Sequence, residues 1–164
     1  MPSDMLVKLY ELQVDWSCVA GQEKLGVVIR KPIGPEMRLL VDWVGKVFSV
    51  GWGSEVAMAL ANKPVSCFVA VREGKPIGFA AYDATVLGFL GPMGVEKSGQ
   101  GQGTGKALLL AALIDMKLKG YGYAIIGAAG PLEFYKKTVG AVEIPGSHPG
   151  VYKTQMKYSC LVKK

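Results

Sequence analysis

The chain has 164 residues, a formal net charge of +6 and 50% hydrophobic residues. This length is typical of one domain with a sizeable core. No apolar run approaches the ~20 residues of a membrane-spanning helix, and Asp4 and Lys8 interrupt the start before the apolar part of a signal peptide could form. We therefore expect a single domain over residues 1–164, in the cytoplasm and without a membrane partner.

The charged residues and cysteines narrow the class of partner. Lysines and arginines are scattered, with only short pairs, and a polyanionic cofactor explains the positive charge as well as nucleic acid does. We expect no nucleic acid partner. Cys18, Cys67 and Cys160 are far apart and fit neither a disulfide framework nor a metal site. We expect reduced thiols and no metal.

The first part of the chain predicts a strand and two helices behind an N-terminal extension. Residues 1–24 are expected to be this extension, with an added strand over 6–14 and a connector over 15–24. The β-branched run 26–30 predicts the first strand. The next elements are a helix that Pro35 opens and that follows helical spacing to Phe48, a break at 50–53, and a second helix that Ser54 caps and Asn62 to Pro64 end.

The second part predicts a hairpin and then alternating helices and strands. Residues 67–72 and 77–83 flank the turn Glu73-Gly74-Lys75-Pro76. The helix over 103–119 is apolar nearly all round, which is typical of a buried helix. The remaining elements are strands at 86–95, 123–128 and 151–158 and a short helix at 131–139. The fold class is α/β, in the form of an α+β layer sandwich.

The most informative stretch is the glycine-rich run from Gln100 to Lys106. Glycines let the backbone approach a ligand, and the start of the following helix favours a phosphate. The P-loop pattern fails, because Gln100 stands where its first glycine belongs and Ala107 stands where a hydroxyl would bind Mg²⁺. The dinucleotide spacing G-x-G-x-x-G is absent too. The spacing that fits is Q/R-x-x-G-x-G/A.

This spacing resembles the acyl-CoA pyrophosphate loop of the GCN5-related N-acetyltransferases (the GNAT superfamily). In that family a valine ends a strand five residues before the Arg/Gln, as Val95 does here. The resemblance covers residues 25–158 and implies a mixed central sheet flanked by helices, with splayed strands at the acyl-CoA site. It implies acetyl-CoA as co-substrate, bound by Met93, Gly94, Val95, Gln100, Gly101, Gln102, Gly103, Thr104, Gly105 and Lys106.

The resemblance also gives a catalytic role to Tyr135, whose phenol would assist departure of the CoA thiolate. The family motif is similar to Y-x-x-x-G-F. Here Gly140 comes one residue late and Ala141 replaces the aromatic residue. A backbone N–H near residues 90–93 would polarise the thioester carbonyl.

The resemblance places the acceptor under two glycine-rich loops, 49–53 and 145–150, which hold Trp52, Ser147 and His148. Asp83, Glu96 and His148 are open alternatives for a general base. The acceptor itself, the acyl chain length and the oligomeric state are not determined by the sequence, and a homodimer is left open.

The function implied is an acyl-CoA-dependent N-acyltransferase that transfers acetyl from acetyl-CoA to a primary amine of a small molecule or peptide by direct attack in a ternary complex. The alternative is a non-catalytic CoA-binding regulatory module of the same fold. A phosphate-binding NTPase is disfavoured by the missing Ser/Thr after Lys106.

Overall fold

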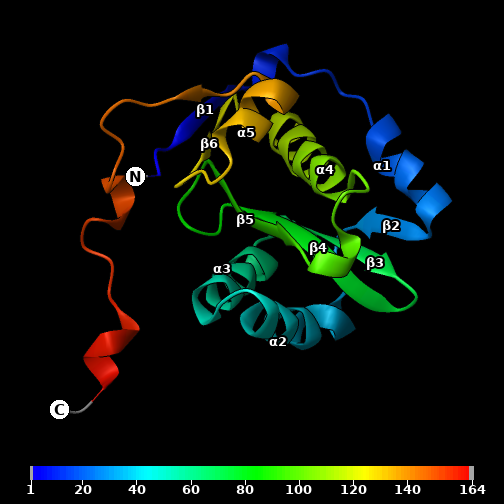
Figure 1. Cartoon of the computed structure of the whole chain (residues 1–164), viewed down its shortest axis with the longest axis horizontal. Coiled ribbons are helices and arrows are strands. Elements are labelled where there is room, and N and C mark those ends of the chain that lie inside the picture. Colours follow the sequence, from blue (N-terminus) through cyan, green and yellow to red (C-terminus); the bar gives the residue numbers. More distant parts are fainter. Residues whose placement is uncertain (1, 163–164) are drawn as a thin grey trace.

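The computed structural model describes residues 2–162 and contains one seven-stranded mixed sheet, in the order β2-β3-β4-β5-β6-β1-β7. Its strands are β1 (Met5–Lys8), β2 (Val27–Arg30), β3 (Cys67–Arg72), β4 (Lys75–Tyr82), β5 (Phe89–Val95), β6 (Tyr123–Ile126) and β7 (Val142–Glu143). Figure 1 shows α2 (Met37–Val47) and α3 (Val50–Ala61) on one face of the sheet, and α1 (Ser17–Gly21), α4 (Thr104–Lys119) and α5 (Leu132–Val139) on the other. The predicted fold class is confirmed.

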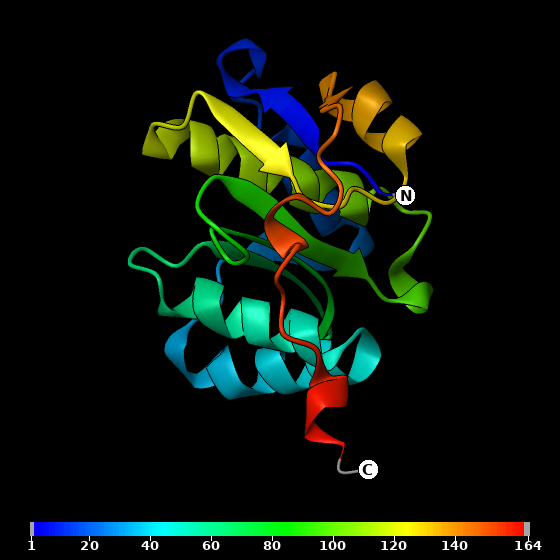
Figure 2. The ribbon, with the colours of Figure 1, turned by 90° about the vertical axis from the view of Figure 1, so that its left-hand side faces the viewer.

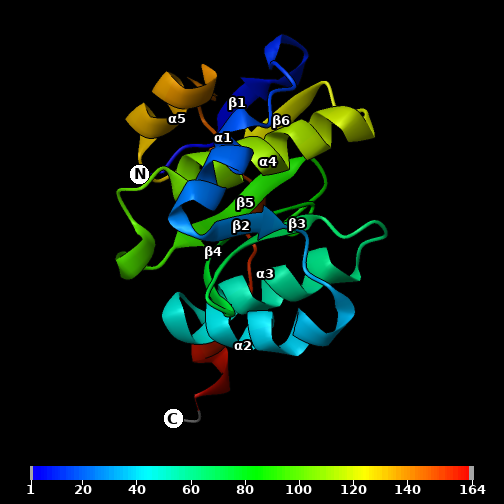
Figure 3. The same ribbon diagram turned by 90° about the vertical axis from the view of Figure 1, so that its right-hand side faces the viewer.

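Helix α4 is buried on nearly all sides, as its sequence predicts. It packs on β3, β4 and β5 of the sheet, and α1 and the segment after β1 cover its other side. Figure 3 shows α1 lying against α4. Its fully buried side chains are Ala107, Leu108, Leu109, Ala111, Ala112, Leu113, Ile114 and Met116.

The N-terminal strand is central to the sheet rather than added at its edge. It is shorter than the predicted 6–14 and lies between β6 and β7, antiparallel to both, with Met5 opposite Ile126. Met5, Val7 and Leu9 are almost completely buried. The predicted connector at 15–24 instead forms α1 and a 3-10 helix, η2 (Gln22–Leu25). The extension therefore completes the core.

The predicted last strand at 151–158 is wrong. This segment forms two 3-10 helices, η5 (Gly150–Tyr152) and η6 (Tyr158–Leu161), and runs along one side of the molecule past α3 (Figure 2). The physical reason is that β1 already occupies the place beside β6, and β7 pairs with β1. The strand-like pattern of the segment finds no open position in the sheet.

The predicted break at residues 50–53 is also wrong, because α3 begins at Val50 and Ser49, not Ser54, is its N-cap. The Ser49 hydroxyl accepts a hydrogen bond from the Trp52 N–H at 3.1 Å. Gly53 allows close helix packing, since a Cβ there would lie 3.2 Å from the Val41 carbonyl oxygen of α2. The glycine that resembles a helix breaker lets α2 and α3 approach each other.

Truncation of the apolar side chains around β1 tests this central role. Leu9 is 0% exposed, whereas Leu161 in η6 is 74% exposed. Leu9→Ala should lower the free energy of unfolding by about 2–5 kcal/mol, because it removes buried surface and leaves a cavity. Leu161→Ala should change it by less than about 0.5 kcal/mol. Equal effects in urea denaturation would contradict the placement of the N-terminal segment in the core.

Candidate functional site

The loop before α4 presents a row of free backbone N–H donors. Gly103, with a φ of 79°, is the N-cap of α4, and Gly101 also lies in the left-handed region, where glycine is favoured. Within the described part of the chain, none of the N–H groups of residues 101–106 donates a hydrogen bond to protein. Unpaired donors at the positive end of a helix dipole form a seat for an anion.

The end of β5 lies beside this loop and is open along one side. The Gln100 Nε2 donates to the Val95 carbonyl oxygen at 3.0 Å, which joins the loop to the strand. Strand β5 pairs with β4 as far as Val95 but with β6 only at Phe89 and Leu90. From Gly91 onward the two strands are splayed. The edge of residues 91–95 facing β6 therefore offers N–H and C=O groups that an extended ligand can pair with.

Gln22 of η2 supports the loop and was not identified from the sequence. Its Nε2 donates to the Gln102 carbonyl oxygen at 3.0 Å, and its Oε1 accepts from the Thr104 hydroxyl at 2.6 Å. Gln22 and Thr104 are both buried. The Arg72 guanidinium fixes the Gln102 side chain at 3.2 Å. These bonds use side chains and a carbonyl, so they hold the loop without using its N–H donors.

A cavity of about 440 Å³ opens beside the first turns of α4. Lys106 and Leu110 of α4, the end of α5 and residues of the segment from Lys8 to Cys18 line it. Because Lys106 belongs to the glycine-rich loop, the cavity continues directly from the row of N–H donors. Its walls carry both lysine and carboxylate groups, so it suits a polar ligand with an anionic end.

Tyr135 lies on α5, on the same face of the sheet as α4, and belongs to the core cluster that includes Leu90. Its hydroxyl forms no hydrogen bond with a residue of the described chain. Burial raises the pKa of this phenol, so it carries its proton at neutral pH. Gly140, with a φ of 63°, ends α5 as a left-handed cap, which accounts for the shifted glycine.

The expected acceptor residues are divided between two places. Trp52 lies in the first turn of α3, stacked on Phe48 and edge-on to Phe79. The Phe48 ring lies directly against Gly94, so this aromatic cluster backs β5 on the α3 face. Ser147 is structural, since its hydroxyl accepts from the Asp4 N–H at 2.8 Å and donates to a carbonyl. His148 is exposed.

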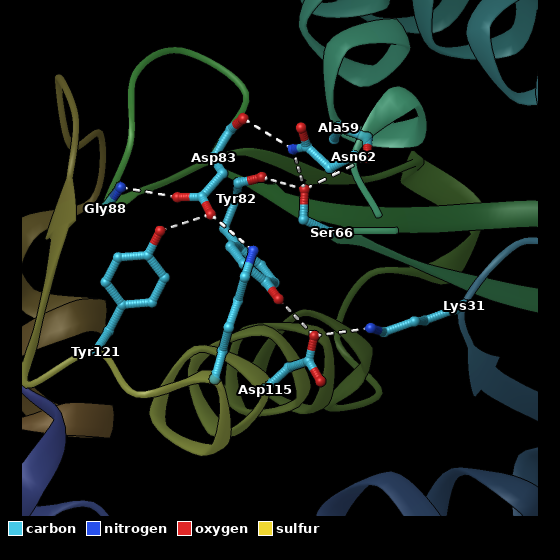
Figure 4. A network of polar contacts seen from close by, with 10 residues as sticks. Lys31, Ala59, Asn62, Ser66, Tyr82, Asp83, Gly88, Asp115 and Tyr121 are labelled. Atoms are coloured by element: carbon cyan, nitrogen blue, oxygen red, sulfur yellow. Dashed lines mark hydrogen bonds and ion pairs between the residues drawn. The ribbon is translucent and has the colours of Figure 1, made fainter. Parts of the chain in front are cut away.

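Asp83, one candidate base, belongs to a closed polar network at the opposite end of α4 from the loop (Figure 4). Its side chain is 2% exposed. The other candidate, Glu96, follows β5 and accepts from Ser98 at 2.7 Å. The partners of the Asp83 carboxylate are the Gly88 N–H (2.7 Å), the Tyr121 hydroxyl (2.7 Å) and the Lys119 ammonium (3.2 Å). Asp83 therefore fixes the turn between β4 and β5 and the end of α4.

Two further surveys of residues 2–162 found no candidates. No helix in that range is long and apolar enough to cross a membrane. No group of three or more His, Cys, Asp and Glu side chains there is placed to hold a metal ion.

Comparisons with known proteins agree with this geometry. Residues 63–138 match the family model of the acetyltransferase (GNAT) domain. A GCN5-related glucosamine N-acetyltransferase region of a fungal multi-domain GH3 β-N-acetylglucosaminidase superposes with a TM-score of 0.70 at 15% identity, over 87% of this chain and 19% of that one. A GCN5-related N-acetyltransferase from Sphaerobacter thermophilus gives 0.61 at 18% identity, over 87% and 48%.

A third solved structure is a GNAT family acetyltransferase from Brucella melitensis in complex with acetyl-CoA. Its TM-score is 0.54 at 22% identity, over 68% of this chain and 80% of that one. The chain thus spans less than half the length of the first two proteins and most of the third. A comparison with curated proteins found no match. The fold and the domain that the glycine-rich loop indicated are confirmed.

Gln22 can be tested separately from the loop itself. Gln22→Ala should weaken CoA binding about tenfold, because the loss of buried hydrogen bonds worth about 1–3 kcal/mol leaves the loop less ordered. The matched control is Gln155→Ala, an exposed position in the C-terminal segment. Isothermal titration calorimetry measures both. A folded Gln22→Ala protein with wild-type affinity would show that η2 does not support the loop.

Proposed function

Because this chain carries a GNAT acetyltransferase domain, we propose that it is an acyl-CoA-dependent N-acyltransferase that transfers acetyl from acetyl-CoA to a primary amine. The observation that carries the proposal is the row of free N–H donors of residues 101–106 beside the splayed edge of β5. The donors suit the pyrophosphate, and the strand edge suits the amide groups of pantetheine. The cavity next to Lys106 would take the nucleotide end.

The two faces of the sheet would have different roles. The loop, the cavity and Tyr135 lie on the α4 face, where they would bind the cofactor and supply a proton to the leaving thiolate. An N–H near the splay, at residues 90–93, would polarise the acyl carbonyl. The acceptor would come from the α3 face. The fungal glucosamine N-acetyltransferase region makes amino sugars one class of acceptor to test.

A panel of amines tests the proposal. Purified protein and acetyl-CoA are incubated with glucosamine, an amino acid, spermidine, kanamycin, and a peptide with a lysine, and thiol release is followed with mass analysis of the products. Acetylation of at least one amine supports the enzyme. Binding of acetyl-CoA with no acetylated product would favour the non-catalytic CoA-binding module, and no binding would reject both.

A charge placed in the loop should abolish cofactor binding. Gly103→Glu brings a carboxylate into the row of N–H donors and a side chain into a left-handed position, so CoA affinity should fall by at least about 100-fold. Gly120→Glu is the matched control, because Gly120 is also left-handed and lies at the other end of α4. Calorimetry with CoA checks both. Unchanged affinity in folded Gly103→Glu would place the cofactor elsewhere.

Removal of the Tyr135 hydroxyl should affect chemistry and leave binding intact. Tyr135→Phe keeps the buried ring and should lower kcat by about 10²–10⁴-fold, with little change in acetyl-CoA affinity. Tyr158→Phe in the exposed η6 is the control. Steady-state kinetics and calorimetry separate the two effects. Lost affinity would indicate a packing role, and full activity would assign protonation of the thiolate to another group.

A further inference from the structure

Three segments that are far apart in the sequence meet at the start of the splay, on the α3 face. Leu90 and Ile126 are neighbours across β5 and β6 and point into the core beneath α4. Because side chains alternate along a strand, Phe89 and Gly127 point to the opposite face. There the Tyr152 hydroxyl lies 2.8 Å from the position that a Cβ on Gly127 would take, beside the Phe89 ring.

Tyr152 is the first member of a chain of hydrogen-bonding groups. Its hydroxyl interacts with the side chain of Thr85, in the loop between β4 and β5. The Thr85 hydroxyl in turn donates to the Glu55 carboxylate of α3 at 2.5 Å. Tyr152, Thr85 and Glu55 are all partly exposed. The chain therefore leads from the splay of the sheet to a carboxylate in reach of solvent.

The charges around this chain are negative. Glu55 and Asp4, from the residue before β1, are the charged groups that face Tyr152, and both disfavour its anion. Neither carboxylate forms an ion pair in the part of the chain that the structure describes. Burial raises the pKa of Tyr152 and the bond with Thr85 opposes this rise. Tyr152 is therefore neutral near pH 7 and can pass a proton on only by exchanging it.

We propose that Tyr152, Thr85 and Glu55 form the proton relay for the acceptor amine, with Tyr152 touching the amine and Glu55 acting through Thr85. The inference rests on the proposed function and adds residues that the loop motif does not contain. It places the acceptor side of the reaction on the face opposite Tyr135, so that one tyrosine serves the incoming amine and the other the leaving thiolate.

The proton transfers balance. The amine nitrogen forms the C–N bond to the acyl carbonyl carbon, and the C–S bond breaks. The thiolate takes a proton from the Tyr135 hydroxyl. The nitrogen gives its proton to the Tyr152 oxygen, while the Tyr152 proton passes to Thr85 and the Thr85 proton to the Glu55 carboxylate. Glu55 then releases this proton to solvent, and Tyr135 regains one from it.

The test measures pH–rate profiles for the variants with the amine of the panel that wild type acetylates fastest. Glu55→Gln, Tyr152→Phe and Thr85→Val should each lower kcat at pH 7 by about 10²-fold, at unchanged acetyl-CoA affinity. Thr85→Ser keeps the hydroxyl and should retain activity. The deficit should shrink as pH rises, because hydroxide replaces the relay. Controls are Asp42→Asn on the exposed side of α2 and Tyr158→Phe.

Each outcome decides. Near-wild-type kcat in Glu55→Gln or Tyr152→Phe overturns the relay while the proposed function stands. A pH-independent deficit, or one that Thr85→Ser shares, assigns these residues a structural role and overturns it too. A loss confined to His148→Ala would move the base to that exposed histidine. If wild type binds acetyl-CoA but acetylates no amine, both the relay and the enzymatic function fail.

Discussion

A helix without a polar face has to be enclosed on every side, and the enclosure of α4 organises this molecule. The sheet covers one side of the helix and the chain before β2 covers the other. At its first residue Thr104 is tied to Gln22, and near its last turn Asp115 accepts the Tyr82 hydroxyl at 2.6 Å and pairs with Lys31 at 3.0 Å (Figure 4). The packing that buries α4 thus also fixes the loop at its start.

The parts of the fold and site that the sequence predicted are those with local signals. The spacing of Gln100, Gly103 and Gly105 depends on backbone conformations within a few residues, and the structure has Gly103 as a left-handed cap. The apolar character of α4 and the turn at Glu73-Gly74 are equally local, and both elements lie within two residues of their expected bounds. Tyr135 on a short helix follows from the same kind of signal.

The features that the sequence did not predict depend on contacts between distant segments. The alternation in 151–158 is typical of a strand, but β1 had taken the only suitable position, so tertiary structure overrode local preference. Gln22 and Tyr152 carry no motif, because their partners are 80 or so residues away in the case of Gln22 and on other elements in both cases. Asp83 resembled a free carboxylate only until its three partners were known.

The position of β1 has a consequence for the order in which the protein is made. Met5 pairs with Ile126, so the strand synthesised first waits for its neighbour until most of the chain has left the ribosome. Contacts between residues so distant in sequence slow folding, and unpaired apolar strands are prone to aggregate in the meantime. The apolar side chains of Met5, Val7 and Leu9 are therefore the surface on which a nascent-chain chaperone would act, and biogenesis rather than catalysis would limit how much active protein a cell obtains.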